Sequence, residues 1–447
     1  MLMSSMKTSS SKHIIVLVTI LYSIMAGSCA KLFAQETAIR CGSEAHNRQL
    51  ELLFPSLKQD RLRLESEIQD YQLQSRAGRI TEQTIRIPVA VHVFHNNSSG
   101  FIGGVNNANI SDEQIISQIK VLNEDYRKQV GTNGYNTNPV GADINIEFYL
   151  ATRDPQGNAS NGITRHFQDK ADYDPYIDWT PIAEIVSWSS DCYLNIWVVP
   201  MQGNTLAIAQ FPSVDGGVTG LNNSTAQLGK TDGILVNHQV FGTVGTAITG
   251  KWKSIYNLGR TTTHEIGHWL GMFHPSGDAF CGTDFCDDTP PTEKQNEGTT
   301  CNEMKSTCAG KQTTNMIENF MDFSPDRCMN IFTLCQKSRS RAVFDRSFRR
   351  KKLLTCASTL PASEQLQVKM FPNPASSSAV LEVLLKGTQN ITIELLDMTG
   401  KNLFTDSYVQ VPSSSLTLRT DMVSDGLYIV RVKTDSETVT QRLVVVR

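Results

Sequence analysis

The pattern of apolar and polar positions predicts alternating helices and strands over the first 350 residues. A polar segment, residues 36–79, carries apolar residues at helical spacing between Leu50 and Tyr71. The run Ile85–Phe94 predicts a strand, and Ile110-Ser-Asp-Glu-Gln opens a helix with a serine cap that runs to about Tyr126. Further strands are predicted at Ile144–Leu150, Tyr193–Val199 and Gly233–Val236.

The pattern changes near residue 351. Residues 351–365 differ in composition from what precedes them and are predicted to form a linker. From residue 366 to residue 447, short alternating strands separated by turn residues predict a small all-β sandwich, with Leu443–Arg447 as its final strand.

The N-terminus has the pattern of a signal peptide, predicted to span residues 1–34. Lys7 and Lys12 precede an apolar run that is too short to anchor the chain in a membrane, and small residues follow it. Cys29 lies in a weak lipoprotein-like box that lacks the usual large aliphatic residue, so lipidation there stays open. No other segment is apolar enough to cross a bilayer, and we expect an exported, soluble protein without a transmembrane anchor once the signal is removed.

Size and composition narrow the class of protein further. A chain of 447 residues is long enough for two or three domains, and 40% hydrophobic with 19% charged residues indicates a sizeable folded core. The net charge of -3 gives no electrostatic reason to expect a nucleic-acid partner.

The cysteines are concentrated in one segment. Six of the ten fall between Cys281 and Cys335, which suggests disulfides in an oxidising compartment. Their spacings lack the paired C-x2-C knuckles of a zinc ribbon, so the sequence favours disulfides over a structural zinc site.

The stretch T-H-E-I-G-H-W-L-G-M-F-H-P, which begins at residue 263, carries the candidate chemistry. On a helix, His264 and His268 lie four residues apart and project from one face. Gly271 allows the chain to leave the helix sharply, so that His274 can return as a third ligand. Three imidazoles leave an open position on zinc, beside which Glu265 can act on a water as general base. The alternative is an amphipathic core helix whose histidines are incidental.

This motif resembles those of the metzincin metalloproteases, and within them it is most similar to the pappalysin family. The likeness spans about Ile87–Phe344 and includes I-P-V-A-V-H-V-F, I-S-D-E-Q-I-I-S-Q-I-K-V-L-N-E-D-Y-R, L-N-I-W-V-V, A-Q-F-P, D-D-T-P and E-N-F-M-D-F-S-P-D-R-C-M. The resemblance implies an α/β metzincin-like catalytic domain at residues 80–350, with a twisted mixed sheet and an active-site helix. It also implies that Met321 is the methionine of a tight turn beneath the site.

The same resemblance implies several further features. Residues 207–211 would form an edge strand that pairs with extended substrate, although an ordinary edge strand fits the bare sequence as well. Two disulfides, Cys281–Cys308 and Cys301–Cys328, would lie below the site, whereas the pairing of the remaining cysteines is left open: Cys192, Cys286, Cys335 and Cys356.

The resemblance further suggests bound calcium near Asp284–Thr289. Asp284, Asp287 and Asp288 suit a hard cation, and a solvated acidic loop is the alternative.

Arg40-Cys41-Gly42 lies in the segment predicted to be a prosegment, residues 35–79. Family members carry such a cysteine as a latency switch, whose thiolate occupies the open metal position and is removed with the prosegment. The alternative is a disulfide, for example with Cys356.

The C-terminal domain is similar to the sorting domains of the bacterial type IX secretion system. The similar stretches are Met370-Phe-Pro-Asn-Pro374, Ile391-Thr-Ile-Glu-Leu-Leu-Asp-Met-Thr-Gly400 and Gly426-Leu-Tyr-Ile-Val-Arg-Val432. This likeness implies that the secretion machinery is a partner and that the protein is secreted or attached to the cell surface. A β-sandwich that binds substrate or carbohydrate is the alternative.

These features together predict a secreted zinc-dependent endopeptidase that acts on protein or peptide substrates. One rival is an exported binding protein on a protease-like fold, which the intact Glu265 argues against; another is a zinc hydrolase of non-peptide substrates. Two departures from the family affect the expected activity. Met329 and Asn330 follow Cys328 where basic-specific relatives appear to carry an acid, which suggests a broader or more apolar preference. Phe323 replaces a tyrosine whose hydroxyl would donate to the oxyanion.

Overall fold

A computed structural model describes residues 38–76, 83–214, 228–246, 255–359, 366–385, 389–411, 414–434 and 438–447. The predicted signal peptide, with Cys29, lies outside the described residues. Within the described part, no helix combines the length and the apolar character that a bilayer crossing needs.

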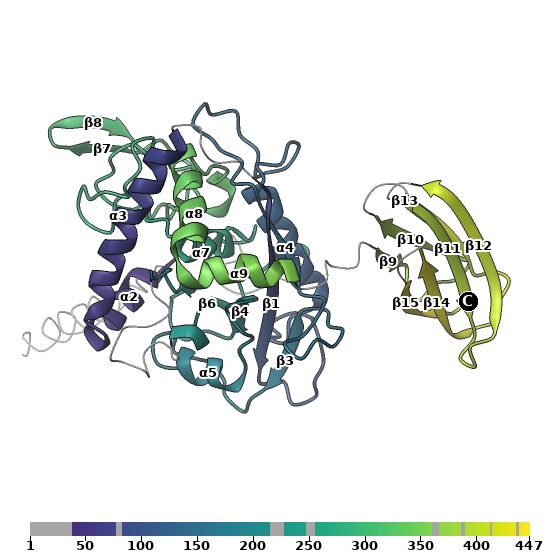
Figure 1. Cartoon of the computed structure of the whole chain (residues 1–447). Helices are drawn as coiled ribbons and strands as arrows, with labels where there is room; N and C mark the ends of the chain where they lie inside the picture. Colours follow the sequence, from purple (N-terminus) through teal and green to yellow (C-terminus); the bar gives the residue numbers. More distant parts are fainter. Residues whose placement is uncertain are drawn as a thin grey trace, which may run out of the picture. The chain divides into compact units, whose positions relative to one another are not determined.

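The centre of the catalytic region is a mixed sheet in the order β2-β1-β4-β6-β5, with β3 also paired to β1 (Figure 1). Its strands are β1 (Ile85–His95), β2 (Ile146–Leu150), β3 (Ile163–Phe167), β4 (Leu194–Val199), β5 (Ala207–Ala209) and β6 (Gly233–Asn237). The first half of β1 pairs with β2 and its second half with β3, and all neighbours are parallel except β5, which runs antiparallel to β6. The sheet therefore ends in one short antiparallel strand.

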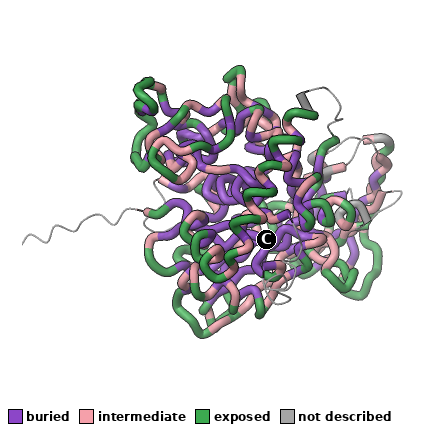
Figure 2. The backbone as a smooth tube through the Cα atoms, turned by 60° about the vertical axis from the view of Figure 1, so that its left-hand side comes forward, coloured by how far each residue is buried: buried purple, intermediate pink, exposed green. Residues whose placement is uncertain are grey.

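Continuous apolar runs explain why these strands are buried. Every residue of β1 except Arg86 is buried, as are all residues of β4, β5 and β6. Runs of this kind are typical of strands that are covered on both faces. Figure 2 shows the buried residues inside the molecule and exposed segments around them. The predicted strands at 85–94, 144–150, 193–199 and 233–236 are found within a residue or two, whereas β3 was not predicted.

Helices from several parts of the chain pack on this sheet. Helix α4 (Asp112–Tyr126) contacts β2, helix α7 (Arg260–Trp269) contacts β5 and β6, and helix α9 (Phe348–Thr359) contacts β1. The serine cap predicted for α4 is present, because the Ser111 side chain accepts a hydrogen bond from the Gln114 N–H at 3.2 Å. A short helix, α5 (Trp179–Ile185), precedes β4.

The N-terminal segment, residues 38–76, forms two helices that belong to the same unit as the sheet. Helix α2 (Ser43–Leu53) begins directly after Cys41-Gly42, and helix α3 (Ser56–Arg76) lies along α8 (Leu334–Arg346) (Figure 1). Leu64, Ile68 and Tyr71 pack against residues of α8, and Arg339 makes two hydrogen bonds of 2.7 Å to Glu65. This interface holds the segment against α8.

The stretch from α7 to α8 contains little regular structure. It holds a two-stranded sheet of β7 (Lys305–Cys308) and β8 (Lys311–Thr314) and the short 3-10 helix η1 (Asp326–Cys328). Disulfides hold this region together, as described below.

The C-terminal domain consists of two antiparallel sheets, which confirms the predicted β-sandwich. The sheets have the orders β13-β10-β9 and β12-β11-β14-β15. Their strands are β9 (Gln367–Phe371), β10 (Ser378–Leu384), β11 (Gln389–Leu396), β12 (Asn402–Val411), β13 (Ser414–Arg419), β14 (Gly426–Lys433) and β15 (Thr438–Val445). Inward-facing residues of both sheets, including Leu381, Ile393, Val430 and Leu443, form its core.

The predicted linker at 351–365 is wrong for its first part, because α9 continues to Thr359. Leu353 is buried, Arg350 pairs with Asp232 at 2.8 Å, and Cys356 forms a disulfide with Cys192. These contacts hold the segment to the catalytic region as a helix. Residues 360–365 lie outside the described residues.

Candidate active site

Helix α7 positions the first two histidines and the glutamate. All ten of its residues are buried, and its N-cap, Gly259, has a φ of 77° and offers no side chain for capping. Asp326 takes that role from a distant part of the chain, since its Oδ2 accepts hydrogen bonds from Leu258 N–H at 2.9 Å and Arg260 N–H at 3.2 Å. A carboxylate at this end also interacts favourably with the helix dipole.

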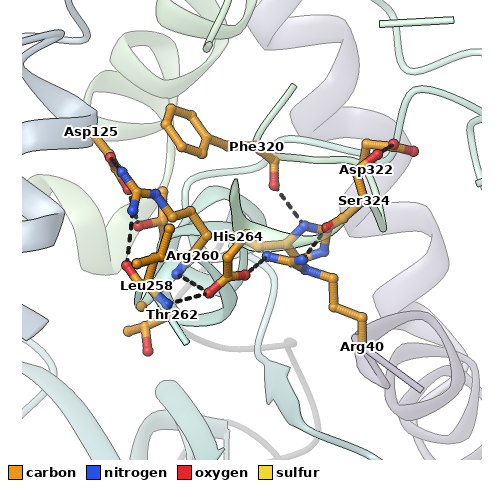
Figure 3. Close-up of polar contacts among 12 residues, drawn as sticks. Arg40, Asp125, Leu258, Arg260, Thr262, His264, Phe320, Asp322 and Ser324 are labelled. Atoms are coloured by element: carbon orange, nitrogen blue, oxygen red, sulfur yellow. Dashed lines mark hydrogen bonds and ion pairs between the residues drawn. The ribbon is translucent and has the colours of Figure 1, made fainter. Parts of the chain in front are cut away.

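A buried ion pair anchors the same helix to α4. Arg260 contacts Asp125 at 3.0 Å, and the Thr263 hydroxyl donates to the other Asp125 oxygen at 2.8 Å (Figure 3). Burial raises the pKa of Asp125 to about 7, although Arg260 acts in the opposite direction. The helix that carries the motif is therefore held on a second side by polar contacts.

The three histidines of the motif converge on one point. The Nε2 atoms of His264, His268 and His274 lie 3.0 to 3.1 Å from one another. Gly271 has a φ of 81°, a conformation that suits glycine, and it ends the helix so that His274 can turn back.

Each ring is held through its other nitrogen. The Nδ1–H of His264 donates to the Phe320 carbonyl at 2.8 Å, and that of His268 donates to the Met272 carbonyl at 2.9 Å (Figure 3). The Nδ1 of His274 contacts the Asp278 carboxylate. Because each Nδ1 faces an acceptor, it carries the proton, and the three Nε2 lone pairs point at one another.

This arrangement fits a metal ion. Lone pairs at such distances repel one another unless a cation lies between them, and zinc with bonds of about 2.0 Å would set tetrahedral nitrogens about 3.3 Å apart. Burial and the neighbouring imidazoles keep the rings of His264 and His268 uncharged, with the pKa of His268 lowered to about 3 and that of His264 lowered well below its usual value. Neutral imidazole is the form that binds metal.

Met321 lies directly beneath the helix. It is fully buried, and a Cβ built on Gly267 would come within 2.2 Å of its sulfur. The turn that carries it also supplies the Phe320 carbonyl to His264, and Asn319 Oδ1 accepts from the Met321 N–H at 2.9 Å. The turn thus supports the site without a side chain directed at the reacting groups.

Residues of the N-terminal segment occupy the site. Cys41 is buried, is not in a disulfide, and lies with the three histidines in a group whose ligand atoms are all within 4.8 Å of one another. Burial and the Glu265 carboxylate raise the pKa of its thiol well above the usual range, so a nearby cation is needed to hold it as thiolate. The alternative disulfide with Cys356 is wrong, because Cys356 pairs with Cys192.

Glu265 is engaged by the same segment. The Ser43 hydroxyl donates to Glu265 Oε2 at 2.6 Å and accepts from the Ala209 N–H of β5 at 2.7 Å. Gly42 N–H donates to the Ala207 carbonyl at 2.9 Å. Two outward backbone groups of the edge strand, the Ala207 carbonyl and the Ala209 N–H, are therefore occupied. Burial raises the pKa of Glu265 to about 7, opposed by the hydrogen bond from Ser43.

Arg40 fills a separate pocket beside the site. Its guanidinium contacts the Ser324 carbonyl (Figure 3) and Asp326 at 2.9 Å. It lies 4.9 Å from the centre of the Tyr256 ring. Both members of the Arg40–Asp326 pair are fully buried. Asp326 thus provides a buried acid beside the site, two residues before Cys328. The broader preference expected from Met329 and Asn330 stays a prediction. Met329 and Asn330 line a cavity of about 330 Å³ to which Asp326 also contributes.

Four disulfides stabilise the catalytic region within the described residues. Cys281–Cys308 and Cys301–Cys328 have the pairing that the resemblance implies. The two further pairs, Cys286–Cys335 and Cys192–Cys356, span 49 and 164 residues. Spacing alone gave no signal for these two, because each joins segments that only the fold brings together.

The acidic segment near Asp284 is used in local hydrogen bonds. Asp284 is buried and accepts from the Thr289 hydroxyl at 2.6 Å and from the Cys286 N–H at 3.1 Å. Burial raises the pKa of Asp284 to about 6, while the Thr289 hydrogen bond lowers it. Asp288 accepts from the Cys335 N–H at 2.8 Å. Calcium at this place remains a prediction.

Comparison with known proteins identifies the family. Residues 245–345 match the family described as pregnancy-associated plasma protein-A, and residues 369–446 match a secretion system C-terminal sorting domain. Extracellular metalloprotease 1 of Coccidioides posadasii is 30% identical over 246 residues, which are 54% of this chain and 72% of that protein. The chain belongs to the pregnancy-associated plasma protein-A family. It is a secreted metalloprotease with a C-terminal sorting domain.

Solved structures of relatives agree with this assignment for the metalloprotease region. A mutant of promirolysin from Tannerella forsythia is 36% identical, with a TM-score of 0.57, and covers 71% of this chain and 98% of its own. Mature mirolysin from the same organism, in complex with a cleaved peptide, is 38% identical with a TM-score of 0.53 and covers 63% and 99%. The metzincin-like fold expected from the sequence is confirmed.

Three residues at the site were missed by sequence reasoning. Ser43, Asp278 and Asp326 each contact a member of the motif or the N-terminal segment through a side chain. Asp326 lies within the stretch E-N-F-M-D-F-S-P-D-R-C-M, which was already identified from the sequence. Ser43 directly follows Arg40-Cys41-Gly42, which was identified in the same way. Their partners lie 222 and 286 positions away, which no local pattern reveals.

Proposed function

We propose that this metalloprotease is a zinc-dependent endopeptidase made as a latent precursor. The observation that carries the proposal is the convergence of three unprotonated Nε2 atoms with Glu265 beside them on one buried helix. In this proposal His264, His268 and His274 hold zinc, as three-histidine catalytic sites do.

Zinc bound there supplies a Lewis acid that polarises a peptide carbonyl and makes a water easier to deprotonate. Glu265 takes the proton from that water and delivers it to the leaving amine. The edge strand β5 binds the substrate backbone, because its Ala207 carbonyl and Ala209 N–H are the groups that now pair with residues 42 and 43.

Latency in this proposal comes from four consecutive residues, each of which occupies a different part of the site. Arg40 fills the pocket of Asp326, and Cys41 takes the open metal position. Gly42 pairs with the edge strand, where a Cβ would come within 2.5 Å of the Tyr176 hydroxyl. Ser43 engages Glu265 and Ala209.

Ser43 adds a block that does not depend on the metal. Its hydroxyl lies between the general base and a backbone donor of the edge strand, where substrate and water would otherwise approach. Loss of the Cys41 thiol alone therefore leaves Glu265 engaged. Likeness to promirolysin, a protein named as a precursor, supports an N-terminal segment of this kind.

We further infer a preference for a basic residue, arginine above all, next to the scissile bond. When Arg40 leaves with the segment, the buried Asp326 loses its partner, and an unpaired buried carboxylate strongly favours a cationic replacement. The Ser324 carbonyl and the Tyr256 ring suit a planar guanidinium better than an ammonium. This inference is an alternative to the broader, apolar preference expected from Met329 and Asn330.

Two finer assignments complete the proposal. The domain at 366–447 is the signal through which the type IX secretion machinery recognises the protein, supported by the match to a secretion sorting domain. Calcium binds near Asp284–Thr289, supported by the buried carboxylate of Asp284.

The test is incubation of the processed protein with an unfolded protein substrate, with and without a zinc chelator, followed by mapping of the cut sites. We expect cleavage that the chelator abolishes and that added zinc restores, with arginine next to most cut bonds. Cleavage that persists in the chelator contradicts a zinc enzyme. Zinc binding without any cleavage points instead to an exported binding protein.

A further inference from the structure

The three candidate ligands differ in what holds their outer nitrogen. His264 and His268 donate from Nδ1 to backbone carbonyls, whereas His274 donates to the side chain of Asp278. Carbonyls are neutral, and their place is set by the fold. The carboxylate of Asp278 is charged and belongs to a single replaceable residue, so the third ligand is supported in a different way from the other two.

The backbone after His274 is shaped to return this carboxylate to its own histidine. Gly277 N–H donates to the His274 carbonyl at 2.8 Å, which closes a turn. Gly277 and Asp278 have φ values of 61° and 56°, so two successive residues adopt the left-handed conformation. A Cβ on Gly277 would come within 2.3 Å of the Thr283 nitrogen, and the turn is therefore packed closely against the next segment.

A second residue helps to keep the carboxylate in place, and the charge of Arg48 also favours its ionised form. Gln295 Nε2 donates to the same Asp278 oxygen at 3.3 Å. The Asp278 side chain is 17% exposed, while His274 is 1% exposed. A non-glycine residue at positive φ is uncommon, and a specific side-chain contact is one reason for a chain to retain it.

A carboxylate bound to the outer nitrogen of an imidazole has two effects on a metal ligand. It fixes the tautomer and the orientation of the ring, and it increases the electron density that the inner nitrogen offers to the cation. It also adds a negative charge to a centre whose other two histidine supports are neutral. His274 needs this support most, because it lies beyond the helix on a turn, whereas His264 and His268 are fixed by α7.

We propose that Asp278 is a positioning residue that orients His274 and strengthens its hold on the metal. The proposal rests on the zinc site proposed above. Asp278 makes no contact with substrate in this proposal. Its loss is expected to lower metal affinity, and turnover would fall only because less metal is bound.

The experiment measures zinc affinity of the full chain by competition with a chromophoric chelator after removal of metal. Three variants are compared with the wild type: Asp278→Ala, Asp278→Asn, and Glu303→Gln as a control at an exposed acid outside the proposed metal sites. Cys41 is present in all of them and contributes equally. Thermal unfolding of the metal-free forms shows whether each variant is folded.

We expect Asp278→Ala to bind zinc about ten- to a hundredfold more weakly, as is usual for loss of such a partner. Asp278→Asn keeps the shape and a hydrogen-bond acceptor but loses the charge, and we expect it to lie between Ala and wild type. The control should match wild type.

The outcomes separate this inference from the proposed function. If wild type binds no zinc, the zinc site itself is refuted. If wild type binds zinc and Asp278→Asn binds it equally well, the carboxylate serves only the turn, and the inference is overturned. Should Asp278→Ala fail to fold, the comparison of Asn with wild type still decides.

Discussion

The proposed metal centre and the proposed latch at residues 40–43 share one buried site but are built in opposite ways. The ligands of the metal centre come from eleven consecutive positions, 264–274, on one helix and the turn that follows. The latch residues reach partners 165 to 286 positions away, in β5, α7 and the segment around Asp326. The residues that the proposed reaction always needs are close together in the sequence. The residues that must leave before the enzyme is active lie on a separate N-terminal segment. The following changes test that contrast, from the largest expected effect to the smallest.

Replacing Glu265 with Ala should remove the proposed general base while zinc stays bound. We expect the processed enzyme to lose about 1000-fold or more in kcat, since general base catalysis contributes on the order of 100- to 10,000-fold. Metal analysis should still give one zinc per chain, because Glu265 is not among the ligands. Glu303→Ala, at an exposed acid, serves as the control. Substantial residual activity in Glu265→Ala would assign the base elsewhere.

The pocket can be tested through Asp326→Asn. Truncating one partner of a buried charge pair costs about 2–5 kcal/mol, so we expect kcat/KM for arginine peptides to fall about 100-fold. Peptides with leucine at the same position should change little, and the ratio of the two substrates is the internal control. Asn keeps an acceptor for the N-terminus of α7, which limits damage to the fold. An unchanged ratio would place the specificity pocket at another group.

The latch should open in two steps. Cys41→Ala alone frees the metal position but leaves Ser43 on Glu265, so we expect only partial activity in that precursor. The double variant Cys41→Ala, Ser43→Ala should be about 10- to 100-fold more active, since hydrogen bonds to charged groups contribute about 1.5–3 kcal/mol. Activity is measured on a short peptide before self-processing, with Ser56→Ala as a control on the same segment. Equal activity of the single and double variants would show that the Cys41 thiol alone keeps the precursor inactive.

Phe323 offers the smallest expected change and a gain in the processed enzyme itself. Its ring centre lies 4.8 Å from that of His274 and 5.8 Å from that of His264, edge to face. Phe323→Tyr adds a hydroxyl near the metal centre, and we expect kcat to rise about tenfold with little change in KM, because an oxyanion contact exists only in the transition state. Phe320→Tyr, at a buried ring that contacts Phe332, is a control for the added hydroxyl alone. An unchanged or lower kcat at full zinc occupancy would show that the absent hydroxyl does not limit the enzyme.

What the sequence could predict follows from the same contrast. Helical spacing placed His264 and His268 together, and the glycine at 271 predicted the return of His274, because these relations depend only on local geometry. The role of Ser43 could not be predicted, since a serine next to a cysteine has no signature until β5 and α7 lie beside it. Asp326 was missed for another reason: its stretch was recognised, but which residue points into the pocket depends on how η1 is turned.

The helices and strands show the same limits. Long apolar runs such as Ile85–His95 were found almost to the residue, because continuous burial leaves few alternatives. The helix α9 was mistaken in part for a linker, since its hold on the catalytic region depends on Asp232 and Cys192, which are distant in sequence. Where the sequence pattern of a segment is weak, tertiary contacts determine whether the segment forms a helix.

The two oxygens of Asp326 have a consequence for attempts to redesign this enzyme. One oxygen closes the start of the active-site helix, and the other receives the guanidinium in the pocket. In the proposed pocket, substrate selectivity and the anchoring of the active-site helix therefore depend on a single side chain. An apolar residue could be introduced in place of Asp326 to accept a different substrate. The same exchange would remove the side chain that caps the helix carrying His264, Glu265 and His268. Altered selectivity is more accessible through Tyr256, which contacts the pocket but does not cap the helix.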